Sequence, residues 1–150
     1  MATKTSLEIL QHLEARLLTI KVASGYSCTI ANVDREYKER AYETYPFFFI
    51  NDIDDKYARR ICKDLYRKIL IVQIIGFIYD DRRSGDVTAA QLGTTLQNLK
   101  ADLSKCLAND TYFNTDDIEM QILEIKTDEG YVPPQASFVA NIAIIHYEGQ

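Results

Sequence analysis

The segment from Leu65 to Tyr79 constrains the fold of this chain more than any other. It is rich in β-branched residues, which lose side-chain freedom in a helix and pack well on a pleated strand. From Ile69 onward both alternating faces are apolar, as in a strand that is covered on both sides. We therefore predict a strand at the centre of a β-sheet, with Arg67 and Lys68 at the end that emerges into solvent.

Two amphipathic helices are predicted before and after this strand. Over residues 5–20 leucines recur every three or four positions, and Thr5 and Glu8 fit a capping box. A second leucine stripe runs over residues 88–108, where Thr88 and Gln91 offer another capping box. Each helix has a single apolar stripe, so both are expected to pack on one sheet.

The remaining strands are predicted at 26–33, 47–50, 118–126 and 137–147. The strand at 47–50 follows Pro46, and Asn51, Asp52 and the charged run up to Lys63 are expected to end it. Loops are expected at 34–45 and 127–135. This order predicts an α+β fold, a two-layer domain with a curved, mixed or antiparallel sheet and two main helices on one face. The chain, 1–150, is expected to form a single domain.

The sheet carries more apolar side chains than two helices can comfortably cover. Those that raise this question are Phe47, Phe49, Ile74, Ile78, Ile142 and Ile144. Either a curved sheet closes on itself, or another subunit covers the remaining apolar surface.

Composition excludes several classes of protein. The 17 basic and 22 acidic residues give a net charge of −5, which argues against a strongly basic nucleic-acid binder. The longest apolar stretch, 69–79, is well short of the roughly 20 residues that a membrane span needs. No signal-peptide core follows the first residues, and three widely spaced cysteines suit reduced thiols. We expect a soluble, cytosolic protein without a membrane partner.

The sequence contains no recognisable catalytic motif, so we expect a protein without enzymatic activity, cofactor or metal. His12 is expected on a helix surface and His146 half-buried on a strand, neither with ligands at metal spacing. One alternative is a Mg²⁺-dependent nuclease that uses Glu124 and Lys126, a carboxylate to hold the metal and a lysine to position water. The separate upstream Pro-Asp of such enzymes is missing, because Phe47 follows Pro46.

Tyrosines and arginine pairs in predicted polar loops are the candidates for a protein interface. The chain has ten tyrosines and no tryptophan, and tyrosine and arginine are favoured where proteins meet. The candidate interface residues are Tyr37, Tyr42, Tyr45, Arg59, Arg60, Arg82, Arg83 and Tyr131. The acidic pairs at 54–55, 80–81 and 116–117 are expected in loops, where they aid solubility.

The layout of the whole chain resembles the tail terminator and minor tail proteins of long-tailed bacteriophages. The matching features, in chain order, are a helix at Leu7–Leu18, a turn at Ser24–Tyr26, a strand at Tyr45–Ile50, an apolar strand ending in Gly76–Tyr79, a helix from Ala90 to Leu107, a loop at Thr127–Tyr131 and a last strand that includes Ile145–Tyr147.

The resemblance implies a virion subunit, assembled in the host cytoplasm, that forms a homohexameric ring on the head-proximal end of the tail tube. Such a ring stops tube polymerisation and joins the tail to the head. Its partners would be copies of itself, the tail tube protein and the head-completion or connector proteins, with DNA passing through the lumen without specific binding. The nearest alternative is a head–tail connector or other neck protein of the same particle.

Overall fold

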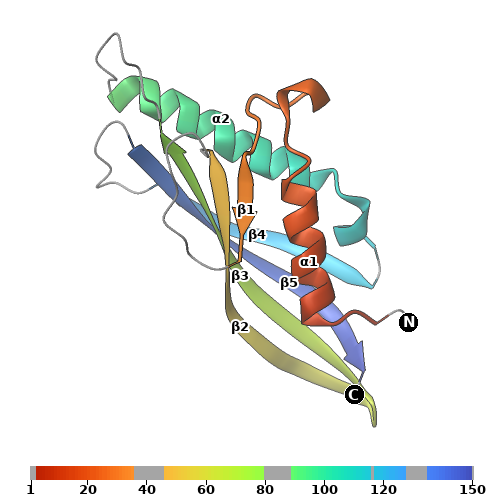
Figure 1. Ribbon diagram of the computed structural model, residues 1–150. Helices are drawn as coiled ribbons and strands as arrows, with labels where there is room; N and C mark the ends of the chain where they lie inside the picture. The colour runs from red at the N-terminus through yellow and green to blue at the C-terminus, as the bar shows by residue number, and fades with distance from the viewer. Residues whose placement is uncertain (1–2, 36–45, 80–88, 116, 128–134, 150) are drawn as a thin grey trace.

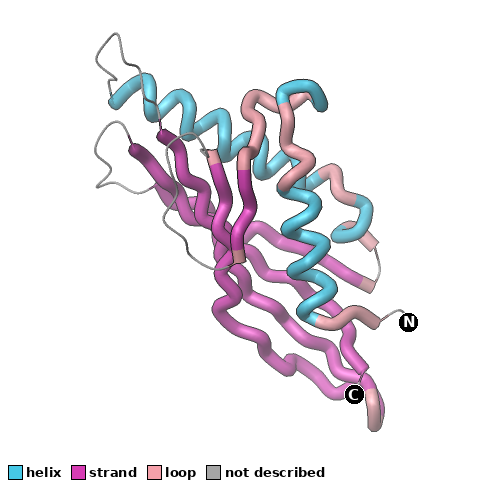
Figure 2. Tube along the Cα trace, viewed as in Figure 1, coloured by secondary structure: helices cyan, strands magenta, loops and turns pink. Residues whose placement is uncertain are grey.

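The computed structural model describes residues 3–35, 46–79, 89–115, 117–127 and 135–149 (Figure 1). Its elements are α1 (Ser6–Leu17), η1 (Val22–Ser24), β1 (Asn32–Asp34), β2 (Phe47–Cys62), β3 (Leu65–Tyr79), α2 (Ala89–Ala108), η3 (Thr111–Phe113), β4 (Ile118–Thr127) and β5 (Gln135–Gly149). The two main helices pack into one hydrophobic core against one face of a twisted sheet (Figures 1 and 2). The predicted α+β fold class is therefore confirmed.

The five strands lie in the order β1-β2-β3-β5-β4. β1 runs parallel to β2, and the other neighbouring pairs are antiparallel, so the sheet is mixed. β3 lies between β2 and β5 from Leu65 to Phe77, as predicted for the apolar segment at 65–79. The strands predicted at 118–126 and 137–147 are also confirmed, as β4 and β5.

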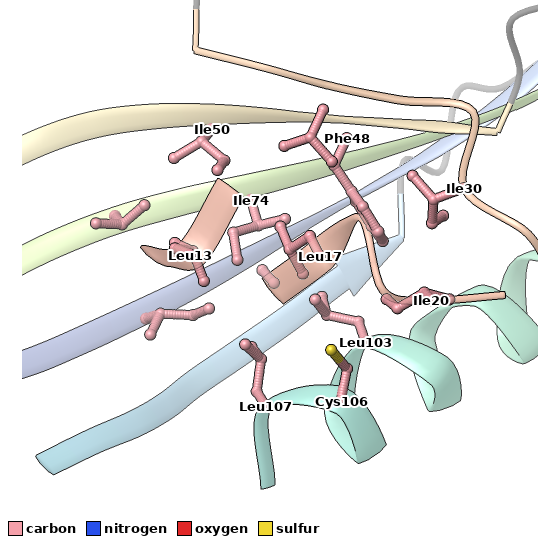
Figure 3. Packing of buried hydrophobic residues seen from close by; sticks show 14 of the residues in the cluster. Leu13, Leu17, Ile20, Ile30, Phe48, Ile50, Ile74, Leu103, Cys106 and Leu107 are labelled. Carbon is pink, nitrogen blue, oxygen red and sulfur yellow. The ribbon is translucent and has the colours of Figure 1, made fainter. Parts of the chain in front are cut away.

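Side chains of β3 alternate between the helix side of the sheet and the opposite side. Leu70, Val72 and Ile74 are fully buried on the helix side. Figure 3 shows leucines of α1 and α2 meeting this face, with Leu13 and Leu17 from α1 and Leu103 and Leu107 from α2. Burying a large aliphatic side chain contributes about 1.5–3 kcal/mol, so this layer dominates the stability of the fold.

The start of α1 has the predicted capping box. The Thr5 hydroxyl accepts a hydrogen bond from the Glu8 N–H at 3.1 Å, and the Glu8 carboxylate accepts one from the Thr5 N–H at 2.9 Å. The capping box predicted at Thr88 and Gln91 lies outside the residues whose side chains are described. The helix predicted over 88–108 is confirmed as α2.

The strand predicted at 26–33 is wrong for most of its length, since β1 begins at Asn32. The buried carboxylate of Asp102 in α2 accepts hydrogen bonds from the N–H groups of Ser27 and Cys28, at 3.0 and 2.8 Å. These bonds replace a strand ladder for this segment. Gly25, just before it, has φ +92°, the left-handed turn conformation expected of glycine here.

The strand predicted to end at Ile50 instead continues to Cys62, so β2 and β3 form one long hairpin. Asp54, Asp55, Tyr57 and the Arg59–Arg60 pair therefore lie on a strand and not in loops. β1 pairs with β2 only at Phe47–Phe49, so the rest of β2 is an exposed margin where polar side chains cost little. Polarity alone was a misleading signal for the end of this strand.

None of the helices in the described part of the chain is long and apolar enough to cross a membrane.

Candidate assembly surface

The face of the sheet that points away from the helices carries a strip of partly exposed apolar side chains. On β3 the strip includes Ile69, Ile71 and Ile75, which alternate with the buried residues of the helix side. In the register of the sheet, Ile69 lies beside Ile145 of β5, and Ile75 lies beside Val139. We call this surface the outer face. Gln73, which lies beside Asn141, interrupts the strip between Ile71 and Ile75. Exposed apolar surface on the face of a sheet is typical of protein interaction sites.

Of the six apolar residues that the sequence analysis singled out, four do not lie on the outer face. Ile74, Ile78, Ile142 and Ile144 all lie buried on the helix side. Of the remaining two, Phe49 is partly exposed, whereas Phe47 is 3% exposed and stacks on Phe77 with ring centroids 4.8 Å apart. Phe47 and Phe49 pair with Phe77 and Ile75 and so lie on the outer face, whereas the four isoleucines lie on the other set of alternating positions.

The β2–β3 hairpin carries a concentration of positive charge at its far end. Residues 56–68 contain six basic residues and one acidic residue. Arg59 of β2 lies directly opposite Arg67 of β3, and neither forms an ion pair with another described residue. Like charges in directly opposed positions are unfavourable, so this pair favours an external anion. Figure 2 shows this end of the hairpin extending past the first turn of α1.

Two of the predicted interface residues, Arg59 and Arg60, are exposed on this hairpin. The Arg60 guanidinium donates hydrogen bonds to the carbonyl oxygens of Cys62 and Lys63, both at 3.3 Å, and so holds the turn. The other candidates lie outside the described residues: Tyr37, Tyr42, Tyr45, Arg82, Arg83 and Tyr131. The structure therefore describes two of the eight candidate interface residues, both on β2.

A buried charge cluster stands at the base of the hairpin, on the helix side. Lys68 is only 5% exposed, and its ammonium donates hydrogen bonds to Asp55, at 3.0 Å, and to Glu148. Ser6 of α1 donates a further hydrogen bond to Asp55, at 2.7 Å. Burial opposes the charge on Lys68, but the hydrogen bonds to Glu148 and Asp55 outweigh it and raise its pKa. We call these charged residues the Lys68 cluster.

The expectation that Lys68 emerges into solvent is therefore wrong. Its partners come from β2 and β5, which are far from it in the sequence, so the spacing of residues gave no sign of the cluster. Arg67, its neighbour on β3, points to the outer face and is partly exposed.

His146 was expected to be half-buried, but it is fully buried beside the Lys68 cluster. Its Nδ1 lies 3.0 Å from the carbonyl oxygen of Lys4. Burial lowers the pKa of the imidazole, although the Lys4 carbonyl and the charges of Asp55 and Glu148 act in the opposite direction. The ring is therefore held neutral in the folded chain at neutral pH.

Acidification is expected to destabilise the fold through His146. Its folded pKa lies below the unfolded value of about 6.5, so the unfolded chain binds the proton first as the pH falls. As the pH falls from neutral to the lowered pKa, the free energy of unfolding should decrease. Below that pKa His146 is protonated in both the folded and the unfolded chain, so it no longer affects the slope. Urea unfolding at a series of pH values would measure it. His146→Gln should flatten the curve in this window, and an unchanged slope in the variant would contradict the assignment.

The two residues of the nuclease alternative, Glu124 and Lys126, both lie on β4. Glu124 and Lys126 are adjacent and exposed on β4, with carboxylate and ammonium 3.5 Å apart, and Asn141 donates a hydrogen bond to Glu124 at 3.0 Å. The described residues contain no group of three or more His, Cys, Asp or Glu side chains that could hold a metal ion. Asp116, which precedes β4, lies outside them.

His12 contacts side chains of the segment that follows α2. Its Nε2 lies 2.7 Å from the Asp110 carboxylate, and its ring stacks on Tyr112 with centroids 3.8 Å apart. Asp110 also caps η3 through the Tyr112 N–H, so these contacts join α1 to the segment after α2.

Comparison with known proteins does not identify a family. The sequence matches no family model, and a search of curated proteins finds no match.

Proposed function

We propose that this chain is a tail terminator subunit of a long-tailed bacteriophage. In this proposal its copies form a ring on the head-proximal end of the tail tube, which stops tube polymerisation and joins the tail to the head. The observation that carries the proposal is the outer face, an apolar strip on the side of the sheet away from the helices. A subunit of a ring needs such a surface to meet its neighbours or the tube.

Two further features support this reading. The helix, hairpin, helix and two-strand layout follows the pattern on which the sequence resembles phage tail terminators. The net charge of −5 suits a ring through which DNA passes without being retained. The tail tube protein and the head-completion proteins are the expected partners, and the virion is the expected location.

The test is electron microscopy of phage particles that lack this gene. We expect overlong tubes and full heads without tails, both corrected by supplying the wild-type gene. Normal-length tails with unjoined heads would instead assign the chain to a head–tail connector. Intact, normally joined virions would reject both readings, and a plasmid-nicking assay with Glu124→Ala as control would then test the nuclease.

A matched pair of variants links this test to the outer face. Ile71→Lys places a charge in the apolar strip, whereas Leu18→Lys places one at a residue that is 40% exposed near the end of α1. The Ile71 variant should fail to complement the deletion while remaining folded by circular dichroism. The Leu18 variant should complement it. Complementation by both folded variants would count against the outer face as an assembly surface.

A further inference from the structure

Parts of the two outermost long strands of the sheet carry opposite charges, although β2 as a whole has three acidic and three basic residues. β2 carries Lys56 and Arg59 on its exposed margin, within the basic segment described above. Lys56 forms an ion pair with Asp54 of the same strand, at 3.4 Å, whereas Arg59 forms none with another described residue. On the opposite side of the sheet, residues 117–124 at the start of β4 contain three acidic residues and no basic one. Of these, Glu119 is exposed and forms no ion pair with another described residue. Arg59 on the β2 margin and Glu119 on the β4 margin are therefore charges without an ion-pair partner among the described residues.

The opposite charges lie at the same level along the strands. Lys56 is paired with Ile69, Ile69 with Ile145, and Ile145 with Glu119, so a single row crosses the sheet from the basic to the acidic margin. Residues in one such row share a face of the sheet, here the outer face. A neighbouring copy related by rotation alone could therefore bring the two charges together without a shift along the strands.

An exposed apolar side chain accompanies the charges on each margin. Ile53 of β2 is 49% exposed and Leu123 of β4 is 51% exposed. Each lies at an irregularity in its strand, between Asp52 and Asp54 in β2 and between Ile122 and Glu124 in β4.

The two apolar side chains are also level with each other. Asp52 and Ile122, the residues just before them, belong to one row through Val72 and Ile142. Each margin thus presents an apolar residue next to a charged one, which is the composition of a small protein interface with a polar rim.

We propose that the β2 margin of one copy docks side by side against the β4 margin of the next, with Ile53 against Leu123 and with Lys56 and Arg59 against Glu119 and Asp117. This inference rests on the proposed function, because it names the subunit contact of the ring. The two margins are different surfaces on opposite sides of the sheet. Contacts of this head-to-tail type generate a closed ring when the rotation between copies closes.

Side chains, and not a continuous strand ladder, make this contact. Asn114 already forms a backbone β-bridge with Glu119 along the edge of β4 that faces away from β5, and three register irregularities interrupt β2. Such irregularities and charges protect an edge strand from indiscriminate pairing. The complementary charges then give the contact its specificity.

A charge exchange tests the contact on the purified chain. Lys56→Glu with Arg59→Glu should weaken self-association, measured by sedimentation velocity at low ionic strength, by roughly tenfold or more. Asp117→Lys with Glu119→Lys should do the same. The chain with all four substitutions should recover most of the wild-type association, since it restores opposite charges across the contact. Added salt should weaken wild-type association.

Lys21→Glu, at an exposed lysine between α1 and η1, is the control and should associate like the wild type. Circular dichroism and thermal unfolding check that every variant is folded. A wild-type chain that stays monomeric at high concentration and low salt would overturn the proposal. A folded chain with all four substitutions that fails to recover self-association would also overturn it. So would binding of the wild type to duplex DNA, if the Lys56 and Arg59 substitutions abolish that binding while self-association persists.

These outcomes are distinct from those of the deletion test. If self-association is lost and recovered as the charge exchange predicts, but the phage without this gene forms normal virions, the contact is supported and the terminator function is rejected. If the phage without this gene shows the terminator defect, but the charge exchange does not affect self-association, only this contact is rejected.

Discussion

Replacing Lys68 by methionine is expected to lower the free energy of unfolding by about 1.5–3 kcal/mol, the usual contribution of hydrogen bonds to charged groups, because the two carboxylates left behind are only partly buried. Methionine keeps most of the apolar stem of lysine, so lost packing contributes little. The ammonium, however, is the hydrogen-bond donor that joins Asp55 of β2 to Glu148 of β5. Without it two carboxylates would face each other on the helix side of the sheet.

Urea unfolding of the variant beside Lys63→Met measures this effect. Lys63 is exposed in the turn of the hairpin, and its replacement should change the free energy of unfolding by less than about 0.5 kcal/mol. Adding Asp55→Asn and Glu148→Gln to the Lys68 variant should recover part of the loss, because the uncompensated charges are then removed. A loss below about 1 kcal/mol for Lys68→Met alone would show that the cluster is not a buried ion pair in solution.

Gly76→Ala is expected to destabilise the chain by about 3 kcal/mol, at the upper end of the usual cost of overpacking. Gly76 lies between Phe48 and Phe138 in the register of the sheet. A Cβ atom built on it would come within 2.6 Å of Cζ of Phe138, whose ring is fully buried, so the ring or the backbone would have to shift. The close approach of this ring to bare backbone explains why glycine stands in the middle of an otherwise bulky strand.

Gly149→Ala is the matched control, since a Cβ there would meet only the carbonyl oxygen of Asp64, at 3.5 Å. It should unfold at nearly the wild-type urea concentration. Shortening the ring in the double variant Gly76→Ala with Phe138→Leu should recover part of the stability lost in Gly76→Ala. If Gly76→Ala alone were as stable as Gly149→Ala, the packing of Phe138 on Gly76 would be wrong.

Hydrophobic periodicity was enough to predict the helices, the central strand and the two C-terminal strands. It failed at β2, where Asn51 and Asp52 were taken to end the strand at Ile50. Beyond that point β2 is held by its backbone pairing with β3, and its side chains are mostly exposed, so their polarity carries no information about the ladder. The segment at 26–31 failed for the opposite reason, because the carboxylate of Asp102, about 75 residues away, binds its backbone.

The candidate surface was only partly predictable. The Arg59–Arg60 pair stood out in the sequence, but its strand did not, and the opposition of Arg59 and Arg67 follows only from the register. The same holds for the level positions of Lys56 and Glu119, which need the pairing of four strands to be known. Lys68 was predicted to be solvated because it lies near the polar end of a strand. It is instead buried and paired with carboxylates that are distant in the sequence.

The position of β5 has a consequence for how the chain reaches this fold during synthesis. β5 follows all the other strands in the sequence, yet it lies between β3 and β4, and Leu65 pairs with Gly149. While a ribosome is still translating the last of these residues, β4 has no neighbour in the sheet and one side of β3 is open. The sheet can therefore be completed only after translation has passed Gly149, and such long-range pairing is intrinsically slow. Until then the apolar residues of β3 are exposed to aggregation, so we expect folding yield to depend on chaperones that bind nascent chains.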